Sequence, residues 1–458
     1  MKNFIYIILA SAFLSSCTKD DNEAESNTSS IDINSGGATT TLNSTSLAFE
    51  DPSANLNAIE SDLHVRGNLA FEATFITAPA TNNPGLGPLF NNTGCAACHV
   101  KNGRASYPTS SSDLGGLLIR VSMNGTDPHG GPLAYPGYGG QLQNRAVFGK
   151  APEADVTLTE ALQIKQFLDG TSYELREPII NLSNHYTPLT SGPMLISPRI
   201  APPIIGLGLL EAISEQTLLA MADEADTNSD GISGKLNYVW DVQANSMKPG
   251  KFGWKAGQPN LTQQAAAAYV NDMGITNPLF THENSVGQPQ DDLTGDDPEI
   301  NAQTLEEASF YTKSVAVPAR RNTTNSVVMA GENIFRAAKC NACHRETITT
   351  STLSGVPSVS NQTIHPYTDL LLHDMGPGLA DNRPEFLATG TEWRTAPLWG
   401  IGLTRVVNGH SNFLHDGRAR NLMEAIMWHG GEATNSVNYV KALSSTQRES
   451  LIKFLESL

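Results

Sequence analysis

The sequence predicts a mainly α-helical protein with two domains and long, loop-rich insertions. Its 458 residues suffice for two domains once an N-terminal segment is set aside. Segments with clear apolar periodicity have the helical period, namely residues 214–222, 327–338 and 445–458, whereas the alternation typical of strands is sparse. The 39 glycines and 26 prolines indicate many turns between these segments.

The first 45 residues are expected to precede the folded part. Residues 1–16 combine a lysine with a short apolar run, which is typical of a signal peptide and too short to cross a membrane. Residues 14–17 resemble a lipoprotein cleavage site, which predicts lipidation of Cys17; the alternative is an ordinary signal peptide with a stray cysteine. Residues 17–45, rich in Ser, Thr, Asn and Asp, predict a flexible tether. Because Thr18 stands where an Asp would retain a lipoprotein at the inner membrane, we expect a lipid anchor at the outer membrane of the cell envelope.

Two runs of the form Cys-x-x-Cys-His carry the strongest chemical signal. Cys95, Cys98 and His99 form the first run, and the second consists of Cys340, Cys343 and His344. This is the signature of covalent c-type haem attachment, in which two thiols bond the haem vinyl groups and the histidine binds the iron. A redox dithiol needs no histidine after the second cysteine, and a structural zinc site needs four ligands. The sequence therefore predicts two covalently bound haem c groups.

The surroundings of the first motif leave its second iron ligand open. His129, His185 and Met194 are candidates, and the position could also have no protein ligand. Lys101 and Arg104 follow the motif and could either pair with haem carboxylates or be solvated.

Residues 226–231 resemble the first half of a calcium-binding loop. Asp226, Asn228 and Asp230 place oxygen side chains at alternate positions before Gly231, where such loops turn sharply. The twelfth position is Asn237 instead of the usual bidentate glutamate, so a complete EF-hand is not expected. The alternatives are a calcium site and a solvated acidic turn.

The formal net charge of −17 argues against nucleic acid as a partner. It is compatible with a basic electron-transfer partner, and equally with an acidic, solvated surface.

Further motifs give the chain a family pattern. They are Ser197–Pro202, Gly208–Ile213, Phe252–Lys255, Asp272–Thr276, Pro366–Gly376, Trp393–Gly400 and His415–Ala419. In this order they resemble the dihaem oxidoreductases, relatives of the bacterial dihaem cytochrome c peroxidases. The resemblance implies two cytochrome c-like haem domains, which we place at residues 46–320 and 321–458.

The same resemblance implies a peroxidase-like enzyme in which one haem binds the substrate and the other transfers electrons. Its partner would be an electron-transfer protein or a small redox substrate such as peroxide. The alternatives are a lipoprotein that only transfers electrons, and an enzyme that oxidises a protein or thiol. The four motif cysteines and Cys17 account for all five cysteines, so no thiol is left for a thiol relay.

Two residues of the first domain carry over from the peroxidases. Those enzymes have a tryptophan between the haems, seven residues before a leucine, and here Trp254 precedes Leu261 by seven. They also have a distal glutamate before Met-Gly, and here the position is Asp272. Without these roles, Trp254 would be a core aromatic and Asp272 a carboxylate at a turn.

The second haem's distal ligand follows from another spacing. The peroxidases have a methionine fourteen residues after the histidine of a His-Asp-Gly motif, and fourteen residues after His415 stands His429. We therefore expect coordination by His344 and His429, with Met375 and His373 as rival ligands. An axial histidine does not raise the potential as methionine does, so this haem is expected to be a lower-potential electron carrier.

Overall fold

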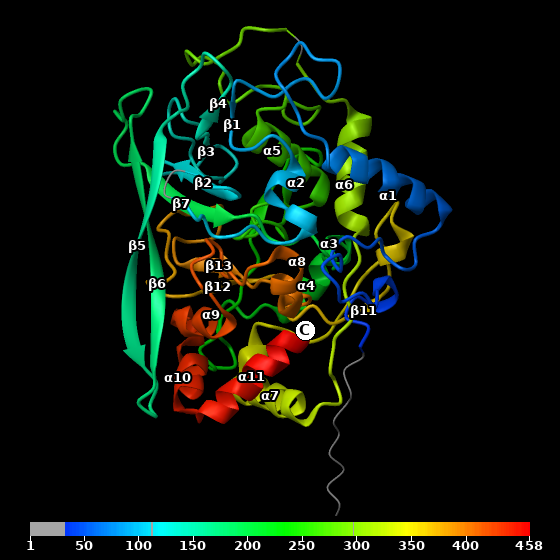
Figure 1. Cartoon of the computed structure of the whole chain (residues 1–458). Helices are drawn as coiled ribbons and strands as arrows, with labels where there is room; N and C mark the ends of the chain where they lie inside the picture. The colour runs from blue at the N-terminus through cyan, green and yellow to red at the C-terminus, as the bar shows by residue number, and fades with distance from the viewer. Residues whose placement is uncertain (1–32, 111–112, 296) are drawn as a thin grey trace, which may run out of the picture. The chain divides into compact units, whose positions relative to one another are not determined.

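The prediction of a mainly α-helical protein is wrong, because the structure contains 28% helix and 19% strand in many small sheets. The computed structural model describes residues 33–110, 113–295 and 297–458, and these belong to one compact unit (Figure 1). The division at residues 320 and 321 stays a prediction. Within the described residues, no helix combines the length and apolar character that a membrane span requires.

The helices are mostly short. The α-helices are α1 (Ala58–Phe71), α2 (Cys95–Cys98), α3 (Leu207–Glu211), α4 (Glu215–Met221), α5 (Leu261–Met273), α6 (Ala302–Ser314), α7 (Ser326–Ala337), α8 (Thr404–Asn408), α9 (Leu422–Trp428), α10 (Thr434–Ala442) and α11 (Ser445–Ser457). The 3₁₀ helices are η1 (Gly37–Thr39), η2 (Val100–Asn102), η3 (Cys340–Ala342), η4 (Pro357–Val359), η5 (Ile401–Leu403) and η6 (Gly431–Ala433).

The strands of the described residues all pair in the antiparallel direction. The largest sheet has the order β3 (Gln141–Leu142), β2 (Leu117–Ser122) and β7 (Leu195–Ile200). The other sheets are pairs: β1 (Leu89–Phe90) with β4 (Arg145–Ala146), β5 (Asp155–Gln166) with β6 (Ser172–Ser183), β8 (Tyr238–Asp241) with β9 (Ser246–Pro249), β10 (Ile348–Thr349) with β11 (Thr363–Ile364), and β12 (Leu372–Asp374) with β13 (Glu392–Arg394).

Two physical reasons explain the missed strands. Most strands have two to six residues, too few for an alternating pattern to stand out. The β5–β6 hairpin has 12-residue strands, but its apolar face is only partly covered: Val156 and Leu158 are buried, whereas Leu162 and Ile164 on the same face are exposed. Long-range contacts hold it beside the C-terminal helices, as where Glu424 of α9 accepts the backbone N–H of Arg176 at 2.6 Å (Figure 1).

The helices expected from periodicity are confirmed. α4, α7 and α11 match the predicted segments to within one residue at both ends. Of the five core residues expected in the last helix, Leu451, Phe454, Leu455 and Leu458 are buried and Ile452 is partly buried.

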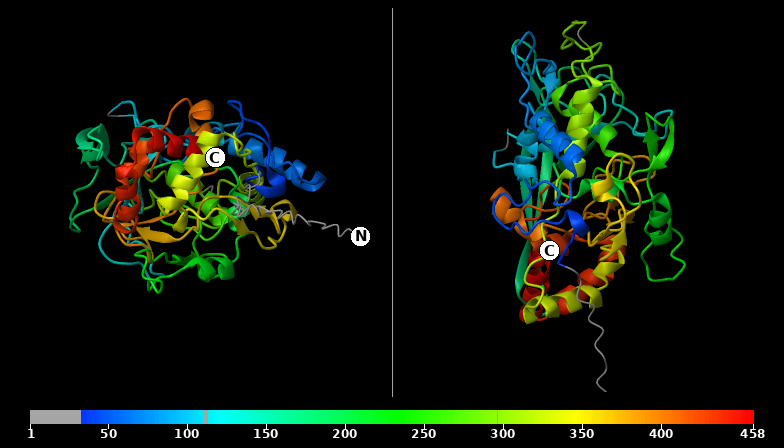
Figure 2. Two further views of the ribbon diagram at one scale, coloured as in Figure 1. Left: turned by 90° about the horizontal axis from the view of Figure 1, so that it is seen from below. Right: turned by 90° about the vertical axis from the view of Figure 1, so that its right-hand side faces the viewer.

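Two helix pairs repeat the same contact. α1 packs on α6 where Gly67 faces Glu307, and α7 packs on α11 where Gly331 faces Ser450 (Figures 1 and 2). A Cβ atom at Gly67 would lie 2.2 Å from the Glu307 carbonyl oxygen, and one at Gly331 would lie 1.9 Å from that of Ser450. Each approach therefore requires glycine.

An aromatic pair accompanies each of these crossings. Four residues after the glycine, Phe71 packs on Tyr311 and Phe335 packs on Phe454, both with ring centroids 5.1 Å apart. The first phenylalanine also lies 6.1 Å from the ring of His99, and the second lies 6.3 Å from the ring of His344. The fold thus positions both motif histidines in the same way.

Candidate functional site

Each Cys-x-x-Cys-His motif lines its own cavity. The first pocket, of about 230 Å³, contains Cys95, Cys98 and His99 in its wall. The second pocket, of about 190 Å³, has Cys340, Cys343 and His344 in its wall and is almost wholly apolar. Apolar cavities with a few placed polar groups are typical of cofactor sites.

The first motif begins at α2, and its histidine is oriented by the backbone. His99 donates from Nδ1 to the Pro202 carbonyl oxygen at 2.8 Å, which leaves Nε2 as the available lone pair. Burial lowers the pKa of His99 to about 4, so the ring is neutral at pH 7. A neutral imidazole with one nitrogen fixed by a carbonyl is the usual form of a metal-binding histidine.

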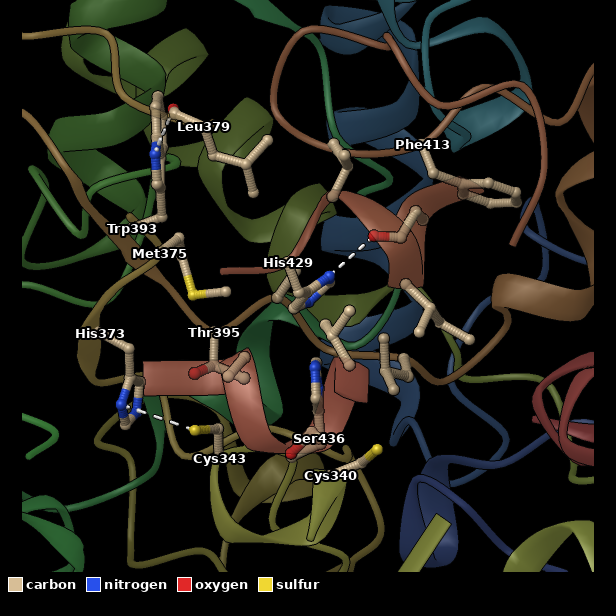
Figure 3. Close-up of a pocket in the computed structure, with 18 of the residues that line it drawn as sticks. Cys340, Cys343, His373, Met375, Leu379, Trp393, Thr395, Phe413, His429 and Ser436 are labelled. Carbon is tan, nitrogen blue, oxygen red and sulfur yellow. Dashed lines mark hydrogen bonds between the residues drawn. The ribbon is translucent and has the colours of Figure 1, made fainter. Parts of the chain in front are cut away.

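The second pocket has the same arrangement and adds a second histidine. His344 donates from Nδ1 to the Tyr367 carbonyl oxygen at 2.9 Å, and burial lowers the pKa of His344 to about 4. His429, at the C-terminal end of α9, donates from Nδ1 to the Ala425 carbonyl oxygen at 2.7 Å (Figure 3). His429 is also close enough to contribute to lowering the pKa of His344. Two Nε2 atoms are therefore available in this one pocket.

The two rival ligands, His373 and Met375, differ in whether their ligand atoms already have partners. Both nitrogens of His373 have carboxylate partners, Nε2 at 3.0 Å from Asp369 and Nδ1 at 2.7 Å from Glu432. Met375 lines the second pocket, and Figure 3 places its thioether on the same side of the pocket as Trp393. Met375 is therefore the rival to His429, and His373 is not.

The first pocket lacks a second histidine among the described residues of its wall. His129 stacks on Trp240 at 3.9 Å, His185 contacts Tyr138, and neither these two nor Met194 lines the pocket. Met273 does line it, but packs in an apolar cluster with Phe75, Tyr269 and Ile275.

Asp272 lines the first pocket from the C-terminal end of α5. Its Oδ1 accepts a hydrogen bond from Gln141 Nε2 at 2.8 Å, while Oδ2 has no partner among the described residues. Burial raises the pKa of Asp272, and the guanidinium of Arg120 opposes this rise. The carboxyl group can thus hold a proton inside the cavity.

Trp254 lies in the walls of both pockets. Its Nε1 donates to the Ile200 carbonyl oxygen at 2.8 Å, so the buried indole is fixed. Its ring meets that of His415 edge to face at 6.5 Å, and His415 stacks on Trp393 at 3.7 Å. The structure therefore brings the predicted relay residue to the position between the pockets, although a relay role stays a prediction.

Two arginines shared by both pockets test whether haem fits here. Arg104 is buried, its Nε has no hydrogen-bond partner, and no carboxylate among the described residues pairs with it. Arg394 donates to the Gly253 and Thr395 carbonyl oxygens. Burial lowers the pKa of each to about 10. Buried cations need anions, and the carboxylates of two haems would supply them, so these residues fit the group.

The remaining predicted residues lie elsewhere. Lys101 donates to the Ser46 carbonyl oxygen and lines neither pocket. In the exposed loop at 226–231, Asp226 and Asn228 accept backbone N–H groups of the loop itself. The side-chain amide of Asn237 donates hydrogen bonds to the carbonyl oxygens of Lys255 and Glu385, and its Oδ1 accepts one from the backbone N–H of Leu387. It is therefore not available as a twelfth-position ligand. Cys17 lies outside the described residues.

Several residues of the pockets escaped sequence reasoning. Arg120 and Gln264 line the first pocket but belong to no motif that signals a site, and Arg394 stands in the Trp393–Gly400 motif, which did not single it out. The repeated Gly-x-x-x-Phe at Gly67 and Gly331 is visible in the sequence and could have indicated the two helix pairs.

Comparison with known families agrees with this geometry. The family model described as "Di-haem oxidoreductase, putative peroxidase" matches residues 30–458. Neither a curated protein nor a solved structure matches the chain.

Proposed function

The chain belongs to the di-haem oxidoreductase family, and on this basis we propose that it is a peroxidase-like enzyme whose two covalently bound c-type haems have different tasks. One haem would bind the substrate in the first pocket, and the other would carry electrons in the second pocket.

One asymmetry carries this proposal. The second pocket presents two backbone-oriented histidines, His344 and His429, enough to fill both axial positions of an iron. Among the described residues of its wall, the first pocket presents one histidine, His99, together with the carboxyl group of Asp272. A six-coordinate haem iron suits electron transfer, whereas a haem iron with an open coordination position can bind a substrate.

The residues of the first pocket suit the reduction of peroxide. A haem held by Cys95, Cys98 and His99 would supply an iron for peroxide to bind and would pass electrons to it. Hydrogen peroxide takes up two electrons and two protons, its O–O bond breaks, and two waters leave; the electrons come from a one-electron donor protein. Asp272 Oδ2, which has no partner among the described residues, would take the proton from the oxygen nearer the iron and return it to the departing oxygen.

Trp254 suits the path between the two pockets. Its indole is buried, lines both cavities and is held by one hydrogen bond, so it changes position little. Electrons that enter at the second pocket would pass it on their way to the first.

The proposal is tested by spin resonance and absorption of the oxidised protein with and without peroxide. We expect one high-spin and one low-spin haem per chain, of which only the high-spin haem responds to peroxide. Asp272→Asn should slow the reaction with peroxide by about 10²–10⁴-fold and leave the high-spin signal. Asp62→Asn, on the exposed face of α1, is the control. Two low-spin haems and no response to peroxide would instead indicate a protein that only transfers electrons.

We also propose the calcium site at Asp226, Asn228 and Asp230. These side chains lie in one exposed turn, with Asp226 holding the backbone N–H groups of Asp230 and Gly231. Calorimetric titration with calcium should give binding that Asp226→Asn together with Asp230→Asn abolishes. Equal heats in the wild type and this variant would leave an acidic turn only.

Lipidation of Cys17, with anchoring at the outer membrane, is a proposal from the sequence alone. Cys17→Ala should release the protein from the membrane fraction or block its processing. Unchanged mass and membrane association would reject the anchor.

A further inference from the structure

Arg120 points to a binding function in the first pocket that none of the family motifs covers. It lies on β2, opposite Gln141 of β3 and Ser197 of β7. Its strand neighbours Ile119 and Val121 are buried on the opposite face, and the side chain of Arg120 lines the first pocket. Its guanidinium makes no hydrogen bond or ion pair with any described residue.

Neither of the two carboxylates that attract Arg120, Asp272 and Glu385, forms an ion pair with it. Glu385 lies at 2.8 Å from Arg199 and 2.9 Å from Arg383, and Asp381 pairs with Lys255 at 2.7 Å. Asp272 attracts Arg120 but is hydrogen-bonded to Gln141. Arg120 therefore lines the cavity without an ion-pair partner among the described residues, in addition to Arg104 and Arg394. Arg120 is partly buried, and a guanidinium that lines a cavity without a partner is costly, which favours an anion in the cavity.

This anion need not be a haem carboxylate. Burial and, after it, the Asp272 carboxylate raise the pKa of Cys95 to about 12, and the same two causes raise the pKa of Cys98 to about 11. Asp272, and Arg120 beside it, are thus near the cysteines. Cys95 and Cys98 would hold a haem through its vinyl groups, so its two carboxylates would need cationic partners elsewhere in the wall. Arg104 and Arg394, beside Trp254, are available for those carboxylates.

We propose that Arg120 and Asp272 together bind a small oxygen or halide anion at the open iron position of the first pocket, with hydroperoxide as the physiological example. The guanidinium donates hydrogen bonds to the negative ligand atom, and Asp272 holds the proton that the neutral ligand gives up. This deepens the proposed function and rests on it. The chemistry makes the pocket selective for ligands that bind as anions over neutral ligands of the same size.

The test uses fluoride, which binds ferric haem as an anion and accepts hydrogen bonds. Absorbance titrations on the full, oxidised, two-haem protein give the fluoride dissociation constant. Hydrogen bonds from a charged donor are worth about 1.5–3 kcal/mol, so Arg120→Gln should weaken fluoride about 10- to 100-fold. Arg120→Lys keeps the charge but loses the planar fork and should fall between.

Arg145→Gln is the matched control. The positive charge of Arg145, like the charges near the first pocket, affects the pKa of Cys98, which it lowers. Arg145 pairs with Asp113 at 3.0 Å, however, and does not line the first pocket. This variant should bind fluoride like the wild type. Haem content and midpoint potentials of both haems are recorded for every variant.

The outcomes distinguish a failure of the proposed function from a failure of the role of Arg120. If the wild type binds no fluoride, the first haem has no free position and the proposed function itself fails. If the wild type binds fluoride and Arg120→Gln binds it within about twofold of the wild type, only the role of Arg120 is overturned. A shifted midpoint potential with unchanged fluoride affinity would assign Arg120 to a haem carboxylate. Should the Gln variant not load haem, fluoride affinity of Arg120→Lys equal to that of the wild type decides against the proposal.

Discussion

Replacing His429 with alanine tests the assignment of the electron-carrying pocket. In the wild type, His344 and His429 offer one Nε2 each, so the oxidised protein should have one low-spin haem per chain. His429→Ala leaves one histidine, and the low-spin count should fall from one per chain to none. The variant loses the Nδ1 bond to Ala425, worth about 1 kcal/mol, so the fold should persist. Spin-resonance quantification of the oxidised protein gives both counts.

Two further variants make the His429 test decisive. His429→Met should restore a low-spin haem and raise its potential, because a thioether ligand favours the ferrous iron. Met375→Ala is the control, since Met375 lines the same pocket. If Met375→Ala turns the second haem high-spin while His429→Ala leaves the spectrum unchanged, Met375 is the ligand. The spacing from His415 would then have been misread, and the division of tasks between the pockets would lose its basis.

Three other variants test the fold and the path between the pockets. Trp254→Phe should slow electron transfer between the haems, measured after photolysis of carbon monoxide, without changing either spin state; an unchanged rate would rule out the relay. Gly331→Ala places a Cβ 1.9 Å from the Ser450 oxygen and should cost about 3 kcal/mol in urea unfolding; a loss below about 0.5 kcal/mol would contradict the close packing. Burial raises the pKa of Glu153 to about 8, so the folded state keeps a proton that the unfolded state has lost between pH 4.5 and 8. This group alone should lower stability across that range by about 1.4 kcal/mol per pH unit. Glu153→Gln should reduce the slope by that amount in thermal melts from pH 4 to 9, and equal slopes in both proteins would refute it.

Local sequence patterns identified the candidate site residues because these residues belong to motifs whose members lie a few positions apart in the sequence. A Cys-x-x-Cys-His run specifies its own geometry, and the structure places both runs in apolar cavities. The positions of Trp254, Asp272 and His429 came from spacings within motifs that resemble those of the dihaem peroxidases, and all three residues line the cavities. Helices such as α11 were readable because one continuous apolar stripe is enough to predict them.

Long-range contacts decided the rest. The fold class was misjudged because two-residue strands have no period, and because the β5–β6 hairpin owes its place to partners such as Glu424, nearly 250 residues away. That His129, His185 and Met194 lie outside the wall of the first pocket could be seen only in the structure. Arg120 has no ion-pair partner and Arg104 Nε has no hydrogen-bond partner because of where side chains from distant segments lie. A sequence records which charges a chain has, but only the tertiary structure determines which of them remain without a partner.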